Sequence, residues 1–117
     1  MSLAIEDQQH GETLVVRLAG RLDTVTAKTF EDHLARHLAQ GARRLIIDLA
    51  GVDYVSSYGL RVFLINAKKL KADRNAFKLC AVTPEVQKIL QISGFDKILT
   101  IRPSVAEEIA ANGAAGT

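Results

Sequence analysis

Two adjacent serines, Ser56 and Ser57, stand between an apolar segment and an amphipathic one, where a hydroxyl has two possible roles. The residues before them, Leu45–Leu49, form a short apolar run that is typical of a buried strand. After them, apolar side chains recur every three or four positions, which predicts a helix beginning directly after the serines. A serine at a helix N-terminus caps an unpaired backbone N–H, and the same place favours an added phosphate, because free N–H groups and the helix dipole attract negative charge.

The three histidines offer weaker material for a site. His33 and His37 are four residues apart on a predicted helix, which is the spacing of two metal ligands on one helix face. Two ligands without a third nearby make a poor site, and His10, in a predicted turn, does not supply it. The sequence therefore predicts polar surface residues here, with no metal site and no cofactor.

Catalysis and thiol chemistry are not indicated either. Ser57, the histidines and several aspartates supply the residue types of a nucleophilic triad. The sequence lacks a Gly-x-Ser-x-Gly elbow and a Gly-x-x-x-x-Gly-Lys phosphate loop, however, so we predict that the protein is not an enzyme. The single Cys80 lies in an apolar segment, where a buried structural thiol in a reducing cytoplasm is expected.

Composition narrows the class of protein. A chain of 117 residues with 48% hydrophobic and 24% charged residues is typical of one soluble globular domain. The net charge of +2 gives no basic face for nucleic acid. No apolar run approaches the roughly 20 residues that span a bilayer, and no signal segment opens the chain. We expect a cytoplasmic protein with neither nucleic-acid nor membrane partners.

Strand and helix patterns alternate along the chain. The N-terminal runs 3–9 and 13–19 predict a hairpin that Gly20 ends, and a helix follows over 25–40. After strand 45–49 we expect a loop over 50–55, a helix that ends at Asp73–Asn75, and a strand over 76–82. Thr83 and Pro84 open a helix that stops at Ser93, before a strand over 97–101 and a short helix from Pro103 to Ala111. One domain over residues 1–111 and a disordered tail over 112–117 follow from this pattern.

Such alternation predicts an α/β fold with a small, mostly parallel sheet, an antiparallel N-terminal strand and about four helices. In parallel sheets, functional sites lie beyond the carboxyl ends of the strands. Ser56 and Ser57 follow the carboxyl end of strand 45–49, so topology and side-chain chemistry indicate the same place.

Residues 48–61, DLAGVDYVSSYGLR, resemble the signature of STAS domains, specifically the bacterial anti-sigma factor antagonists. In that family a buried strand ending in Asp is followed by a loop and then Asp-Ser-Ser-Gly-Leu or Ser-Ser-Ala-Gly-Leu-Arg at a helix start. Gly20-Arg21-Leu22-Asp23 is similar to the family's Gly-Glu-Leu-Asp, and the resemblance extends over nearly the whole chain. It implies the small mixed sheet and about four helices predicted above.

The resemblance also implies a phosphorylation switch that transmits signals to transcription. The phosphoacceptor position falls on Ser57, with Ser56 as second choice. The unphosphorylated protein binds an anti-sigma factor of the serine-kinase type and thereby releases a sigma factor. The kinase phosphorylates the serine, the complex dissociates, and a metal-dependent serine phosphatase reverses the modification. The alternatives are that Ser57 only caps a helix, or that the protein is a free-standing STAS subunit of a transport or stress-sensing complex without a phosphoswitch.

Two residues depart from the commonest family pattern. Ser56 stands where many members have Asp, and Tyr58 where Ser or Ala is usual. Tyr58 either packs on the partner, accepts phosphate itself or obstructs the kinase. The expected partner-binding residues are Asp23, Tyr54, Ser56, Ser57, Tyr58, Gly59 and Arg61.

Three of the charged side chains have more than one possible role. Asp23 contacts the partner or caps a helix. Arg61, four residues after Ser57, reaches a phosphate there or is simply solvated. Asp48 is expected to order the following loop by accepting backbone N–H bonds.

Overall fold

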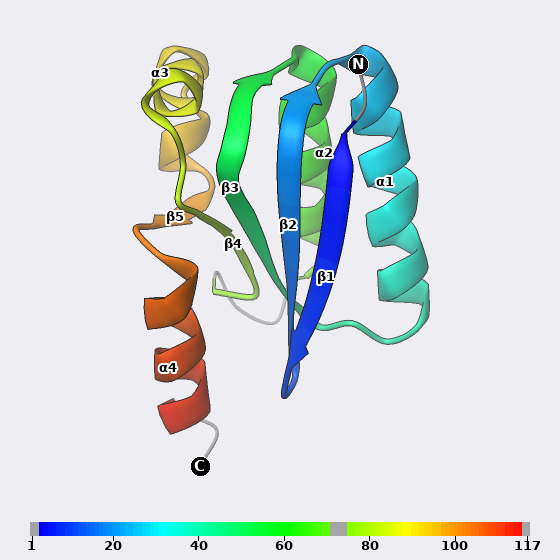
Figure 1. Ribbon diagram of the computed structural model, residues 1–117, viewed down its shortest axis with the longest axis vertical. Helices are drawn as coiled ribbons and strands as arrows, with labels where there is room; N and C mark the ends of the chain where they lie inside the picture. The colour runs from blue at the N-terminus through cyan, green and yellow to red at the C-terminus, as the bar shows by residue number, and fades with distance from the viewer. Residues whose placement is uncertain (1–2, 71–74, 116–117) are drawn as a thin grey trace.

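The computed structural model describes residues 3–70 and 75–115, with the side chains of 112–115 excepted. In chain order the elements are β1 (Ala4–His10), β2 (Thr13–Leu22), α1 (Thr24–Ala39), β3 (Arg44–Val55), α2 (Ser57–Lys69), β4 (Phe77–Cys80), α3 (Pro84–Ser93), the 3₁₀ helix η1 (Phe95–Lys97), β5 (Thr100–Arg102) and α4 (Val105–Ala115). This is the predicted alternation of strands and helices (Figure 1). Among the described residues, no helix combines the length and hydrophobicity that a membrane crossing requires.

The five strands form one mixed sheet in the order β1-β2-β3-β4-β5. β1 pairs antiparallel with β2, and the β2–β3, β3–β4 and β4–β5 pairs are parallel. The prediction of a mostly parallel sheet with an antiparallel N-terminal strand is therefore confirmed. A helix follows each of the two long parallel strands, which places both helix N-termini at one edge of the sheet (Figure 1).

The two faces of the sheet bury different sets of side chains. Alternate residues of the strands, such as Leu14, Val16 and Ile47, pack in the main core with the apolar sides of α1, α2 and α3. Phe30 of α1 and Phe63 of α2 meet edge to face there, with ring centroids 6.0 Å apart. The strand residues that alternate with those of the main core face the other side of the sheet and form a small second core. It consists of Val15, Ile46 and Cys80, covered by Val105 and Ile109 of α4.

The two central strands are longer than predicted. β3 continues through residues 50–55, where the sequence indicated a loop. Val52 and Val55 are buried in the main core, and both of them, with Gly51 and Tyr54, still pair with β2. β2 likewise passes through Gly20. The register between the two strands shifts at Arg17/Ala19 and Gly20/Arg21, and Gly20 has φ 125°, a conformation that favours glycine. Gly20 therefore allows an irregularity inside the strand and does not end it.

The remaining boundaries differ by a few residues. The C-terminal strands are shorter than predicted, and η1 takes the place of the expected start of β5. α4 extends to Ala115, past the predicted end at Ala111, in an alanine-rich segment with high helix propensity. Two predicted features lie outside the described residues. They are the end of α2 at Asp73 and Arg74, and the last residues of the tail, Gly116 and Thr117.

A buried ion pair attaches α4 to the sheet. Lys78 of β4 is 4% exposed at its side chain, and its Nζ lies 2.6 Å from Glu108 Oε1 on α4. Arg102 Nε lies 3.9 Å from the same oxygen. The neighbouring Cys80 thiol is buried as predicted, and this burial raises its pKa to about 11. A lysine in this position depends on Glu108, because a buried ammonium without a partner is costly.

Replacing Glu108 by leucine is expected to lower the free energy of unfolding by about 3 kcal/mol, because it leaves the Lys78 charge buried and without its carboxylate. The double variant Lys78→Met/Glu108→Leu should recover most of this loss, since two apolar side chains replace the pair. Urea denaturation of the three proteins measures the effect. A double variant no more stable than Glu108→Leu alone would contradict this account of α4.

Candidate functional site

The site predicted from the sequence lies where β2 and β3 end side by side. The last residues of these strands, Leu22 and Val55, are register partners in the sheet. Each strand is followed by one capping residue and then a helix: Asp23 before α1, and Ser56 before α2. This edge therefore presents two helix N-termini together, at the carboxyl ends of parallel strands (Figure 1).

Ser56 is the N-cap of α2. Its Oγ accepts a hydrogen bond from the Gly59 N–H at 3.2 Å, which satisfies one of the unpaired donors of the first helical turn. Its own N–H donates to the Leu22 carbonyl at 2.7 Å, so the start of the helix is tied to the end of β2. The cap role that the sequence left open for either serine belongs to Ser56.

Ser57 is the first residue of α2 and is exposed. No hydrogen bond joins its hydroxyl to another described residue, in contrast to Ser56. A kinase can reach such a hydroxyl without opening the fold. The helix N-terminus beneath it favours the negative charge that phosphorylation adds.

Gly59 is buried in the first turn of α2 and lies against the ends of β2 and β3. A Cβ atom at this position would lie 2.8 Å from Val55 Cγ1 and 3.3 Å from Leu22 Cβ. Neither neighbour can easily move, because both side chains are buried in the main core. Glycine is thus a packing requirement, and it was placed among the partner-binding residues by the sequence motif.

Tyr58 is oriented toward α1. Its hydroxyl donates a hydrogen bond of 2.7 Å to Glu31 Oε1, and Lys28 Nζ lies 3.5 Å from the same oxygen. The hydrogen bond to the Glu31 carboxylate raises the pKa of Tyr58 above its ordinary value, so the phenol stays protonated. Sequence analysis did not single out Glu31, because the contact joins residues 27 positions apart on two helices.

Asp23 caps α1 through a complete capping box. Its Oδ1 accepts from the Thr26 N–H at 2.8 Å, and its own N–H donates to Thr26 Oγ1 at 3.0 Å. The hydrogen bond from the Thr26 backbone is the largest cause that holds the pKa of Asp23 below its ordinary value. Of the two roles considered for Asp23, the helix cap is the one that the structure contains.

Two cationic residues accompany the serines at this edge. The Arg21 guanidinium lies over the ring of Tyr54, 4.4 Å from its centroid, and Tyr54 is 36% exposed. Arg61 is exposed one helical turn after Ser57. Arg21 pairs with Tyr54 through the register of β2 and β3, which no spacing in the sequence reveals.

Asp48 lies away from the serines, on the α4 side of the sheet. Its Oδ1 accepts a hydrogen bond from the Ala50 N–H at 3.0 Å, and its Oδ2 lies 3.1 Å from Arg17 Nε. These contacts fall at the register shift between Arg17 and Ala19, where β3 and β2 are irregular. The carboxylate therefore organises a strand irregularity at residues 48–51, where the sequence analysis expected the strand to end and a loop to begin.

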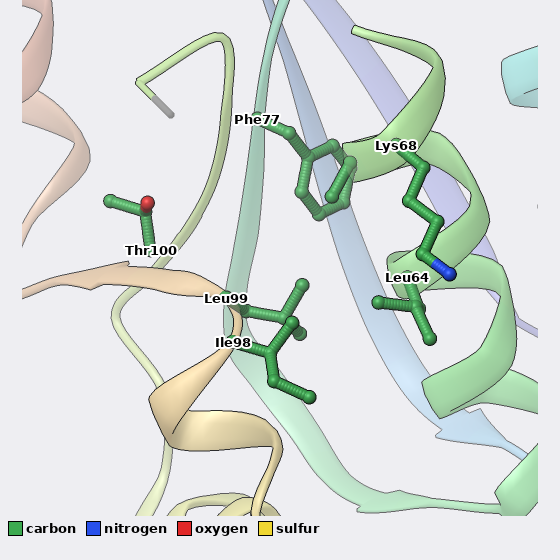
Figure 2. A pocket seen from close by; sticks show the side chains of 7 residues that line it. Leu64, Lys68, Phe77, Ile98, Leu99 and Thr100 are labelled. Atoms are coloured by element: carbon green, nitrogen blue, oxygen red, sulfur yellow. The ribbon is translucent and has the colours of Figure 1, made fainter. Parts of the chain in front are cut away.

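A shallow apolar pocket lies at the other end of α2, between this helix and the segment around β5 (Figure 2). Its lining is Leu64, Ala67, Lys68, Phe77, Ile98, Leu99 and Thr100. Lys68 follows Ser57 by about 16 Å along the helix axis, at 1.5 Å per residue. The pocket is thus separate from the carboxyl edge.

The chain matches the family model of the STAS domain over residues 4–108. The Bordetella bronchiseptica protein BtrV is 37% identical over 91 residues, which cover 78% of each protein. A Paenibacillus polymyxa protein named anti-sigma F factor antagonist is 29% identical over 102 residues, covering 86% of this chain and 87% of the relative.

Solved structures agree with this match. The crystal structure of an anti-sigma factor antagonist from Mycobacterium paratuberculosis superimposes with a TM-score of 0.83 at 26% identity, over 93% of this chain and 92% of that one. The anti-sigma factor antagonist SpoIIAA, in its unphosphorylated form, gives a TM-score of 0.79 at 24% identity, over 97% and 98% of the two chains. Its phosphorylated form gives 0.70.

The two serines are expected to differ in their effect on stability. Ser56→Ala removes the N-cap and should lower the free energy of unfolding by about 1 kcal/mol. Ser57→Ala should change it by less than about 0.5 kcal/mol, because the residue is exposed and makes no side-chain bond to the described residues. Urea denaturation of both variants tests this difference. Equal losses for the two would show that Ser57 shares the cap.

Alanine at position 59 should destabilise the protein by about 1–3 kcal/mol through overpacking, although Gly→Ala inside a helix ordinarily stabilises. The cause is the 2.8 Å approach of the new Cβ to Val55 Cγ1. In a Val55→Ala background, where that methyl is absent, the cost of Gly59→Ala should fall markedly. A cost that is unchanged in that background would mean that Val55 is not the obstacle.

Proposed function

Because the chain belongs to the STAS domain family, we propose that it acts as an anti-sigma factor antagonist that phosphorylation of Ser57 switches off. In this function the unphosphorylated protein binds a serine-kinase-type anti-sigma factor and frees the sigma factor that the kinase had held. The relatives named for this activity span most of the chain, which supports the general function.

The observation that supports the switch is that only one of the two serine hydroxyls is used by the fold. Ser56 is occupied as the cap, with its hydroxyl bonded to the Gly59 N–H, whereas the Ser57 hydroxyl is exposed. A phosphate on Ser57 would leave the cap intact. Phosphorylation can therefore change the surface without unfolding α2, which is what a reversible switch requires.

The energetic effect of the phosphate differs on the two sides of the interface. It adds about −1.5 to −2 charges to a neutral hydroxyl at pH 7. Within the free protein, the N-terminus of α2 and Arg61 stabilise this charge. Against a bound partner the same charge must be desolvated, so the complex is weakened. The fold is compatible with both states, because SpoIIAA has this fold in its unphosphorylated and phosphorylated forms.

Tyr58 fits this function as a structural neighbour of the switch. Its hydroxyl is bonded to Glu31, so the bulky side chain is directed toward α1. We infer that Tyr58 does not accept the phosphate, and that it contributes its ring edge to the partner surface together with Tyr54. In the proposed switch, the kinase partner phosphorylates Ser57, and a metal-dependent serine phosphatase removes the phosphate.

The switch is tested with wild type, Ser57→Ala and Ser57→Asp, used as baits in native lysate of the source organism. Mass spectrometry identifies the bound proteins, and the recovered kinase is then purified for binding measurements. Wild type and Ser57→Ala should bind the kinase, and Ser57→Asp should bind it at least tenfold more weakly, a difference of about 1.4 kcal/mol. ATP and the kinase should add one phosphate to wild type and none to Ser57→Ala.

Ser56→Ala is the matched control, because it removes a neighbouring hydroxyl and keeps the acceptor. It should still be phosphorylated. If all three baits bind the kinase equally, the switch model fails. Recovery of transporter or stress-complex subunits in place of a kinase would establish the alternative STAS role.

A further inference from the structure

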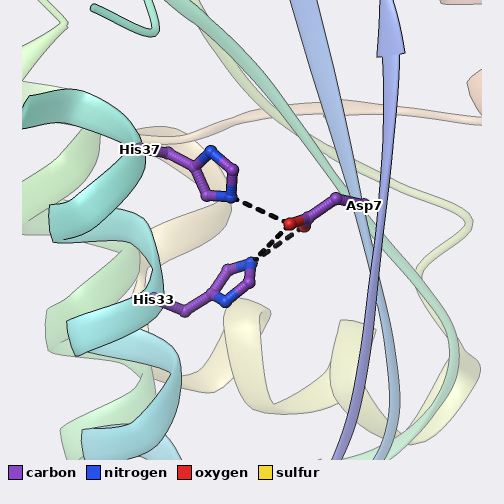
Figure 3. Close-up of side chains that lie close together, drawn as sticks. All are labelled: Asp7, His33 and His37. Carbon is purple, nitrogen blue, oxygen red and sulfur yellow. Dashed lines mark hydrogen bonds and ion pairs between the residues drawn. The ribbon is translucent and has the colours of Figure 1, made fainter. Parts of the chain in front are cut away.

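Three potential metal ligands converge between β1 and α1, away from the serines (Figure 3). His33 Nε2 lies 2.9 Å from both carboxylate oxygens of Asp7, and His37 Nε2 lies 2.8 Å from Asp7 Oδ2. The ligand atoms of all three residues lie within 4.8 Å of one another. Both rings thus present the same nitrogen to one carboxylate.

The fold creates this arrangement from residues that are distant in the sequence. His33 and His37 are one turn apart on the same face of α1, and their ring centroids are 4.9 Å apart. Asp7 comes from β1, where its register partner is Val16. Val16 belongs to the core on the α1 side, so Asp7 faces this helix. Sequence analysis found two ligands without a third, and the packing of α1 beside β1 supplies that third ligand.

We propose that Asp7, His33 and His37 bind a divalent transition-metal ion of the zinc class. Bonds of about 2.0–2.1 Å to a common ion place neighbouring ligand atoms about 2.9–3.4 Å apart. The 2.8–2.9 Å separations between the histidine nitrogens and the Asp7 oxygens are already close to this spacing. The two histidine nitrogens lie within 4.8 Å of each other, so an ion draws them together by small rotations of partly exposed side chains.

The chemistry of the ligands selects the class of ion. Two imidazoles and one carboxylate suit Zn²⁺, Co²⁺, Ni²⁺ and Cu²⁺, whereas Mg²⁺ and Ca²⁺ prefer oxygen ligands. The side chains of Asp7, His33 and His37 are 30%, 16% and 26% exposed, so the ion can enter from solvent. Three protein ligands leave at least one coordination position for water or for a group from another molecule.

Arg36 opposes metal binding in the present arrangement. Its Nη2 lies 3.3 Å from His33 Nδ1, and since arginine only donates, Nδ1 accepts and Nε2 carries the proton toward Asp7. Coordination through Nε2 moves this proton to Nδ1, so the Arg36 contact must break. Arg36 is exposed and can move away into solvent. Arg36 therefore competes with the metal ion for His33, and replacing Arg36 gives a specific test of the proposal.

The experiment uses the full chain, free of any polyhistidine tag and dialysed against EDTA. Titration with Zn²⁺ is followed by calorimetry, and titration with Co²⁺ by its visible absorption. One ion should bind per chain, and the midpoint of thermal unfolding should rise as free Zn²⁺ increases, because the ion binds only the folded arrangement. Asp7→Asn, His33→Gln and His37→Gln should each weaken Zn²⁺ binding by at least about 100-fold. A residue that only orients a ligand usually costs about 10- to 100-fold when it is lost, so a larger loss identifies a ligand.

Two controls separate this site from other binding. His10→Gln removes the remaining histidine, which is not part of the cluster, and should leave Zn²⁺ affinity unchanged. Arg36→Gln removes the competing donor and offers an oxygen to His33 Nδ1–H, so it should tighten binding. Circular dichroism without metal checks that each variant is folded.

The proposal is overturned if wild type binds Zn²⁺ no more tightly than the His33→Gln/His37→Gln double variant, or if His10→Gln loses as much affinity as the ligand variants. The site does not depend on the proposed switch, because His33 lies about 14 Å along α1 from its first residue, at 1.5 Å per residue. Zn²⁺ affinity should be the same in Ser57→Ala and Ser57→Asp. A failure of the switch would leave this result unaffected.

Discussion

The close approach of Gly59 to the ends of β2 and β3 is the constraint on which the candidate site depends. Leu22 and Val55 leave no room for a side chain there, since a Cβ would come within 2.8 Å of Val55. With glycine in place, α2 begins directly at the sheet edge, and the Ser56 N–H reaches the Leu22 carbonyl. This contact also positions Ser56 and Ser57, because they lie in the short segment between Val55, at the end of β3, and Gly59.

In the proposed switch, stability and regulation depend on two different serines that stand side by side. The Ser56 hydroxyl accepts a hydrogen bond from the backbone of α2, and the adjacent Ser57 remains exposed. Tyr58 is held by Glu31 on the neighbouring helix. A charge added at Ser57 therefore meets a helix N-terminus that favours it, while the hydrogen bonds that hold α1, α2 and β2 together stay as they are. The proposed phosphorylation would therefore change the surface that the partner binds and leave the fold as it is.

The proposed metal site uses a different part of the same architecture. β1 is the edge strand of the sheet and pairs only with β2, and α1 packs over this side. Asp7 and the two histidines join the edge strand to the helix through their side chains. An ion there would strengthen the attachment of β1, and it would do so without contact with the residues around Ser57. The two proposals thus concern separate parts of the domain, one at the start of α2 and one between β1 and α1.

The sequence by itself determined the features that depend on neighbouring residues. Apolar periodicity predicted the order of strands and helices, and Thr83 with Pro84 predicted the start of α3, because caps and helix faces involve residues within one turn. Pairing between distant segments decided the rest. Only the β2–β3 register extends β3 to Val55 through a segment that looked like a loop, and only the packing of α1 beside β1 brings His33 and His37 to Asp7. These contacts join residues more than 20 positions apart, and tertiary packing, not local spacing, sets their geometry.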